Sequence, residues 1–319
     1  MSTIGLSFRE GSAADLASTF ALAERAAHEL AARPASILPE SEPSDAEIAA
    51  DWKRERGLID FMAAQPDGRY FVCDEDGEGA VGYARVIRFE GMEQVTELTV
   101  RPDRQDRGIG RALLERCWPG DPTPELGRIA IVGGTPSDLT LYTDFGVMPI
   151  TGHWQLRQRT EAYLEARSNE PDAFDAASVH VLEVGHAVSE WKRLEPQAIG
   201  HARPLLHDYF GRDRACLARL DERSGEATAL CWISPDGAIG PAIGAWPKDL
   251  LPVVLAALDR VAKAREPEFL SVYCTSISWW LLRRLRGLGF RVDTPRWVLC
   301  SVPLPGLDRY APTRPARLL

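Results

Sequence analysis

The 319-residue sequence is poor in the features that mark metal, redox and membrane proteins. Its six cysteines form no CxxC pair and its six histidines are scattered, which argues against a zinc site or a redox dithiol. No apolar run approaches the ~20 residues that cross a bilayer. The first ten residues also lack the basic start and apolar core of a signal peptide. We therefore expect a cytoplasmic protein without a membrane partner and without a metal.

Length and charge narrow the class further. A chain of 319 residues exceeds one average domain, so two domains are the better expectation. The net charge of −9 argues against nucleic acid as a partner, and it favours a cationic partner only weakly, since solubility alone could explain it.

The first half reads as a mixture of strands and helices. Ile4, Leu6 and Phe8 alternate like a half-buried strand. Ser12 with Asp15, and Ser44 with Glu47, are capping-box signals that predict two helix starts. Further strands are predicted over 70–73, 80–89, 95–100, 129–132 and around 154–156, with helices beginning near 108 and 135. This order predicts a mixed α/β or α+β domain.

The second half repeats part of the first at a constant spacing. Gly146, Thr151, Trp154 and Leu156 recur 143 residues later as Gly289, Thr294, Trp297 and Leu299. The same spacing places strand 95–100 on 238–243, and the helix that follows it on 251–261. The front of the second copy is shorter by about 32 residues, roughly the segment of the Ser44 helix. We predict domains over 1–159 and 178–319, joined by a polar linker over 160–177.

One stretch carries chemistry. A strand ending at Val100 leads through a turn into Gln105-Asp-Arg-Gly108-Ile-Gly110-Arg and then a helix. A helix start offers unpaired backbone N–H groups and a positive dipole end. Glycines let this backbone approach an anion closely, and Arg104, Arg107 and Arg111 add positive charge. The combination suits a pyrophosphate, although Gly-x-Gly before a helix is alone a weak signal.

The stretch closely resembles the acetyl-CoA signature of the GNAT superfamily, Arg/Gln-x-x-Gly-x-Gly/Ala after a strand ending in valine. The resemblance covers about residues 4–157. It implies an N-acetyltransferase fold with a mainly antiparallel central sheet flanked by helices. The resemblance assigns the pantetheine arm of acetyl-CoA to the backbone of the strand end, and the pyrophosphate to the loop. The residues concerned are Leu98, Thr99 and Val100 for pantetheine, and Gln105, Asp106, Arg107, Gly108, Ile109, Gly110 and Arg111 for the phosphates.

A second family pattern, Asn-x-x-Ala-x-x-Leu-Tyr-x-x-x-Gly-Phe, is matched in part. Thr135 stands at the Asn position, Leu141-Tyr142 matches Leu-Tyr, and Gly146 matches the glycine. By resemblance, Thr135 is a cofactor contact and Tyr142 is the acid that protonates the departing thiolate. The alternative is a tyrosine that only packs its helix.

Glu97 lies on the strand where family members often carry a base or a water-holding carboxylate, so we name it as the candidate general base. The alternative is a solvated edge carboxylate, and Glu93 and Glu90 are weaker candidates for the base. Trp52, Tyr83, Arg85 and Trp154 could line the acceptor site or simply pack.

The second copy lacks these groups. At the 143-residue spacing, Gln105, Gly108 and Gly110 become Lys248, Leu251 and Val253, and Tyr142 becomes Leu285. We therefore expect a tandem GNAT protein whose second copy is degenerate and binds no cofactor. Trp279 and Trp280 are predicted to fill the core of that copy. The alternative is that they belong to an apolar surface with which the second copy packs against the first and walls its acceptor side.

Three functions remain open at this point. The first is transfer of acetyl from acetyl-CoA to the amine of a small molecule by direct attack. The second is acetylation of a protein or peptide amine, and the third is a regulatory module that binds acyl-CoA without turnover. The sequence does not name the acceptor or the oligomeric state.

Overall fold

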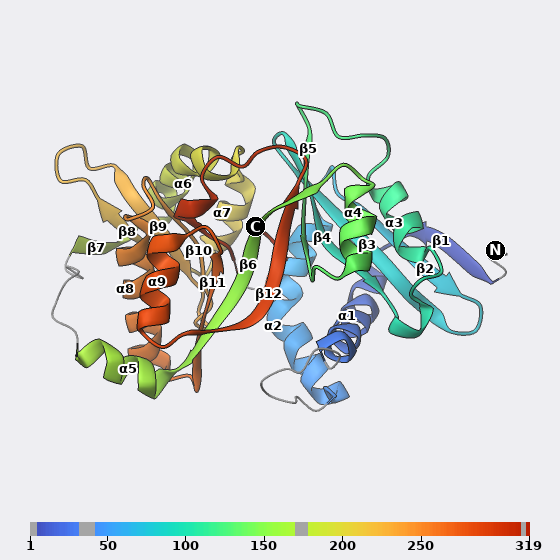
Figure 1. The fold of residues 1–319 in the computed structure, drawn as a ribbon, viewed down its shortest axis with the longest axis horizontal. Coiled ribbons are helices and arrows are strands. Elements are labelled where there is room, and N and C mark those ends of the chain that lie inside the picture. Colours follow the sequence, from blue (N-terminus) through green and yellow to red (C-terminus); the bar gives the residue numbers. More distant parts are fainter. Residues whose placement is uncertain (1–4, 32–41, 170–177, 314–316) are drawn as a thin grey trace. The chain divides into compact units, whose positions relative to one another are not determined.

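The structure is a computed structural model that describes residues 5–31, 42–169, 178–313 and 317–319 (Figure 1). The chain divides into two compact units. Unit 1 consists of the described residues up to Ile129 together with Asp144–Gly146, and unit 2 of Ala130–Thr143 and the described residues from Val147 onward. Among the described residues, no helix is both long and apolar enough to cross a membrane.

Unit 1 follows the predicted order of strands and helices. Its elements are β1 (Leu6–Glu10), η1 (Ala13–Asp15), α1 (Leu16–Ala31), α2 (Asp45–Ala63), β2 (Arg69–Glu75), β3 (Gly79–Phe89), β4 (Met92–Val100), η2 (Pro102–Arg104), α3 (Ile109–Cys117) and the start of β5 (Gly127–Val132). The strands lie in the order β1-β2-β3-β4-β5. The three pairings from β1 to β4 are antiparallel, and α1 and α3 both pack on β3 and β4.

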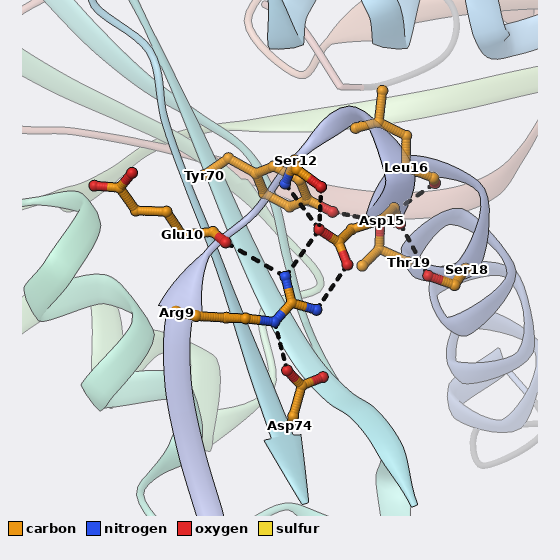
Figure 2. Close-up of polar contacts among 9 residues, drawn as sticks. All are labelled: Arg9, Glu10, Ser12, Asp15, Leu16, Ser18, Thr19, Tyr70 and Asp74. Atoms are coloured by element: carbon orange, nitrogen blue, oxygen red, sulfur yellow. Dashed lines mark hydrogen bonds and ion pairs between the residues drawn. The ribbon is translucent and has the colours of Figure 1, made fainter.

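Both predicted helix starts are confirmed. The Asp15 carboxylate accepts the Ser12 backbone N–H at 2.8 Å, and the Ser44 hydroxyl accepts the Glu47 N–H at 3.3 Å. Arg9 of β1 then ties the first of these caps to β2, because its guanidinium donates to Asp15 at 2.7 Å and to Asp74 at 2.6 Å (Figure 2). The hydrogen bond from Arg9 holds the pKa of Asp15 well below its usual range. These contacts of Arg9 hold the start of the η1–α1 segment against the strands β1 and β2.

Unit 2 contains two groups of strands. Its elements are the end of β5, α4 (Pro136–Thr143), β6 (Met148–Arg159), α5 (Thr160–Ser168), β7 (Val179–Leu182), α6 (Val184–Ile199), α7 (Pro204–Phe210), β8 (Ala215–Leu220), β9 (Ala227–Ile233), β10 (Ile239–Gly244), α8 (Leu250–Arg265), β11 (Phe269–Thr275), α9 (Trp279–Gly287), β12 (Arg291–Cys300), η4 (Leu307–Arg309) and β13 (Tyr310–Ala311). One group has the order β12-β6-β11 and the other the order β13-β10-β9-β8-β7. All of these pairings are antiparallel, and the buried face of α8 supplies much of the core.

The predicted repeat appears as repeated secondary structure. The first residues of α4 and α9 are 143 positions apart, as are the first residues of β6 and β12. The strand and helix predicted near 238–243 and 251–261 are β10 and α8. The mixed fold with helix-flanked sheets is therefore confirmed. Part of the shorter front of the second copy lies in α7, which has 7 residues where α2 has 19, so the second helix is shortened rather than missing.

Two further details differ from the sequence analysis. Residues 160–168 of the predicted linker form the helix α5, while 170–177 lie outside the described residues. The prediction that Trp279 and Trp280 fill the core of the second copy is wrong, because their exposed fractions are 68% and 61%. They open α9, whose buried side chains are instead Leu281 and Leu285.

Candidate active site

Glu97 lies in the buried middle of β4 and carries two partners from β3. Tyr83 Oη donates to Glu97 Oε1 at 3.1 Å, and Arg85 Nη1 donates to Glu97 Oε2. Arg85 stands directly opposite Glu97 in the antiparallel register. Only 8% of Glu97 and 2% of Arg85 are exposed, so the alternative of a solvated edge carboxylate is wrong. Burial lowers the pKa of the Arg85 guanidinium, and the facing carboxylate offsets that cost.

The other carboxylates considered for the base are placed differently. Glu93 is buried and its Oε1 accepts from Arg69 at 2.8 Å, whereas Glu90 is exposed at the β3–β4 turn. Among the aromatic candidates for the acceptor site, Tyr83 is fully buried. Trp52 packs on Phe20 with ring centroids 5.5 Å apart.

Replacing Glu97 by glutamine should lower the free energy of unfolding by about 3–5 kcal/mol, because it leaves the buried Arg85 charge without its counter-ion. Urea unfolding followed by circular dichroism measures this. Glu90→Gln is the matched control, since an exposed substitution should stay within about 0.5 kcal/mol of wild type. A Glu97→Gln protein as stable as this control would show that the pair contributes nothing to folding.

The loop after β4 has the backbone shape of an anion cradle. Asp106 and Gly108 both adopt left-handed φ angles, 61° and 80°, and α3 begins immediately afterwards. Gly108 is the residue that caps α3, and no described side chain caps this helix in its place. A Cβ at Gly108 would find no described atom within 4 Å, so the space above the helix start is open. The loop therefore presents helix N–H groups toward open space, as a bound anion requires.

Side chains brace this loop from both sides. Gln105 Nε2 donates to the Val100 carbonyl at 3.2 Å, which closes the turn onto the end of β4. Arg104 Nε contacts Glu75 at 2.6 Å, and Arg111 pairs with Asp144. Arg107 is 53% exposed and lies 3.9 Å from Glu75. Exposed ion pairs contribute little to stability, so Arg107 and Arg111 can exchange these partners for a phosphate at small cost.

Tyr142 lies on α4 and Thr135 directly precedes this helix, both within unit 2. The Thr135 hydroxyl accepts the Asp138 N–H at 3.1 Å, and the Thr135 N–H donates to the Asp138 carboxylate at 3.3 Å. Thr135 thus caps α4, which begins near residue 135 as predicted, and its hydroxyl is engaged by the helix itself. Tyr142 is buried in the last turn of α4, and its carbonyl accepts the Val147 N–H at 3.4 Å.

The corresponding positions of the second copy are closed. Leu251 and Val253 are buried in the first turn of α8, and Leu285 is buried in α9. No described group of three or more histidine, cysteine or acidic side chains could hold a metal ion. The Tyr83–Glu97–Arg85 cluster was not predicted as a unit. Counting back from the Glu90-Gly91 turn would have placed Arg85 opposite Thr96, because the register shifts between Arg85 and Val86.

The fold and the loop are similar to those of acetyltransferases of the GNAT type. Residues 66–146 match the Acetyltransferase (GNAT) domain family, a stretch that contains β4, the loop, α3 and α4. A tandem GNAT protein from the clavulanic acid biosynthesis pathway has a similar structure, with a TM-score of 0.57 at 17% identity over 93% of this chain and 99% of that one. A proposed acetyltransferase from Pyrococcus horikoshii gives a TM-score of 0.65 at 14% identity over 97% of this chain and 94% of that one. At identities this low, structural similarity shows only that the fold is shared.

Sequence relatives point to the same class. The mycothiol acetyltransferase of Nocardiopsis dassonvillei is 28% identical over 195 residues, which are 57% of this chain and 56% of that protein. The mycothiol acetyltransferase of Streptomyces griseus subsp. griseus is 27% identical over 204 residues, 63% of this chain and 60% of that protein. The matched region thus spans less than two thirds of either relative.

Proposed function

We propose that this protein transfers an acetyl group from acetyl-CoA to the amine of a small molecule by direct attack. The observation that carries the proposal is the open, glycine-capped start of α3 directly after β4, within the segment that matches the GNAT domain. A helix start without a side-chain cap, next to partly exposed arginine side chains, suits a pyrophosphate better than it suits any neutral ligand.

Different residues of the chain would bind the cofactor, accept a proton and donate a proton. The backbone of Leu98, Thr99 and Val100 would hold the pantetheine arm, and the residues from Gln105 to Arg111, the candidate pyrophosphate loop, would hold the phosphates. Acetyl-CoA supplies the activated thioester. Glu97, held by Tyr83 and Arg85, would be the base that takes a proton from the amine, directly or through a water. The Tyr142 hydroxyl would donate its proton to the departing sulfur.

Two alternatives remain, and one of them has a specific observation in its favour. Thr135 replaces the family asparagine and its hydroxyl is occupied by Asp138, which favours a protein that binds acyl-CoA without turnover. A peptide acceptor is the other alternative. The relatives named mycothiol acetyltransferases favour a small molecule over a peptide.

The test combines calorimetric titration of acetyl-CoA with a thiol-release assay over a panel of small amines and peptides. We expect binding and amine-dependent release of one thiol per acetyl group transferred. Binding without release over the whole panel would favour the non-catalytic module, and release with peptides only would favour the peptide acetyltransferase. Absence of acetyl-CoA binding would overturn the proposal.

The protein's own thiols should not contribute to that assay. All six cysteines are buried, and burial raises the pKa of each thiol above its usual value. The pKa rises to about 11 for Cys73 and Cys300 and to about 12 for Cys117, Cys216 and Cys274. Because the thiolate is the reactive form, we expect no fast reaction of the native chain with Ellman's reagent near pH 8.

Unfolding the chain in guanidinium provides the control, since it should release six reactive thiols per chain. Stoichiometric labelling of the native chain on the assay timescale would contradict this prediction. It would also show that at least one of these side chains is accessible.

A further inference from the structure

The last described strand, β13, pairs with β10 inside unit 2. β13 is antiparallel to β10, with Ala311 opposite Ala242 and Tyr310 opposite Ile243. β13 also contacts β11, the strand that follows α8. The residues just before it, in η4, bond to the same region, because the Leu307 carbonyl accepts the Thr275 hydroxyl of β11 at 2.6 Å. Residues 307–311, the C-terminal strap, therefore lie along the edge of β10 that does not pair with β9.

This edge is the counterpart of the strand edge predicted to hold pantetheine. The 143-residue spacing maps Ala242 and Ile243 onto Thr99 and Val100. The two positions differ in exposure: Thr99 and Val100 are partly exposed in unit 1, whereas Ala242 and Ile243 are fully buried. Pairing with β13 thus covers in the second copy the backbone that the first copy leaves accessible.

Several contacts hold the strap in place. Arg309 donates to the carbonyls of Gln197, at 2.6 Å, and of Ala245. The Tyr310 ring is fully buried, and its hydroxyl accepts from Arg203, which is itself paired with Glu195 at 2.7 Å. A buried aromatic anchor with a satisfied hydroxyl is the kind of group that dominates the energy of an interface.

The phosphate end of the second copy is closed as well. Asp249 stands at the N-cap position of α8; its carboxylate makes no described hydrogen bond to the helix and accepts the Trp246 N–H at 3.2 Å. A negative charge at a helix start interacts favourably with the positive end of the helix dipole and repels a phosphate. Leu250, the first residue of α8, is fully buried. The second copy therefore has neither an open loop nor an open strand edge.

We propose that the C-terminal strap is an internal ligand of the second copy and occupies the groove that corresponds to the pantetheine site of the first. An extended backbone segment replaces an extended pantetheine chain, since both can pair with a strand edge through amide hydrogen bonds. Because the strap is tethered, its effective concentration is in the millimolar range, which a free ligand would have to exceed. The assignment of the first copy's edge to pantetheine rests on the proposed function.

The test follows amide hydrogen exchange of the full chain by mass spectrometry. Tyr310→Ala removes the buried anchor and should speed exchange of the β10 amides by about 10-fold or more, while β1–β4 exchange stays unchanged. Leu205→Ala, at a position 56% exposed in the same unit, is the control and should change neither. Unchanged β10 exchange in Tyr310→Ala would overturn the proposal.

A second measurement needs no variant, so it holds even where Tyr310→Ala fails to fold. Saturating acetyl-CoA should slow exchange in residues 98–111 of the wild type and leave residues 239–244 unchanged, with one acetyl-CoA bound per chain. Protection of 239–244, or a stoichiometry of two, would overturn the strap proposal. Absence of protection at 98–111 would instead count against the proposed function. The exchange of β10 in Tyr310→Ala would still test whether the strap covers that strand.

Discussion

A Gly110→Glu protein should bind acetyl-CoA at least about 100-fold more weakly than wild type while remaining folded. Gly110 is the second residue of α3, directly beyond the open helix start at Gly108. A glutamate there would place a side chain and a negative charge where the phosphates must approach. Like charges brought together cost several kcal/mol, and each 1.4 kcal/mol is tenfold in affinity. Titration calorimetry measures the loss directly.

The matched control is Gly185→Glu. Gly185 is likewise the second residue of a helix, α6, and a Cβ there would meet no described atom within 4 Å. The two variants add the same charge at the same position of a helix, so a general effect of the added charge should appear in both. Wild-type affinity in Gly110→Glu would show that the candidate pyrophosphate loop does not hold the phosphates, and the proposed function would lose its main support.

The local features of the fold were predictable because they depend on neighbours in sequence. The caps at Ser12 and Ser44 are three-residue patterns, and the structure forms both. The left-handed Gly108 before α3 follows from glycine's freedom at a tight turn. The 143-residue spacing located β10 and α8 correctly, because insertions within the back half of the repeat are short.

The features that were not predicted depend on tertiary contacts, which decide which side chains are buried and which residues pair. The apolar character of Trp279 and Trp280 suggested a core position, but the buried face of α9 is set by Leu281 and Leu285, which point another way around the helix. The pairing of Glu97 with Arg85 depends on a register that a bulge beside Arg85 shifts, so counting from the turn alone is insecure. The C-terminal strap has only two strand residues, too few for a periodic signal.

The corresponding test of the chemistry is Tyr142→Phe, which should lower kcat by about 10²–10⁴, the range typical of losing a general acid. The substitution removes one oxygen from a buried side chain and keeps the ring, so packing in α4 should persist. If the hydroxyl acts only on the departing sulfur, the Michaelis constant for acetyl-CoA should change little, because the hydroxyl then does not contribute to binding of acetyl-CoA in the ground state. Steady-state thiol release with a good acceptor amine gives both constants.

Tyr163→Phe separates this effect from the general cost of losing a buried hydroxyl. Tyr163 is a fully buried tyrosine of the same unit, and its hydroxyl donates to Asp259 at 2.6 Å. Because Arg167 still pairs with Asp259 at 2.7 Å, the variant should lose about 1–3 kcal/mol of stability without a matching loss of kcat. A Tyr142→Phe enzyme with wild-type kcat would make Tyr142 a packing residue. Equal losses of kcat in both variants would mean that the defect comes from a disturbed unit 2 and not from a missing acid.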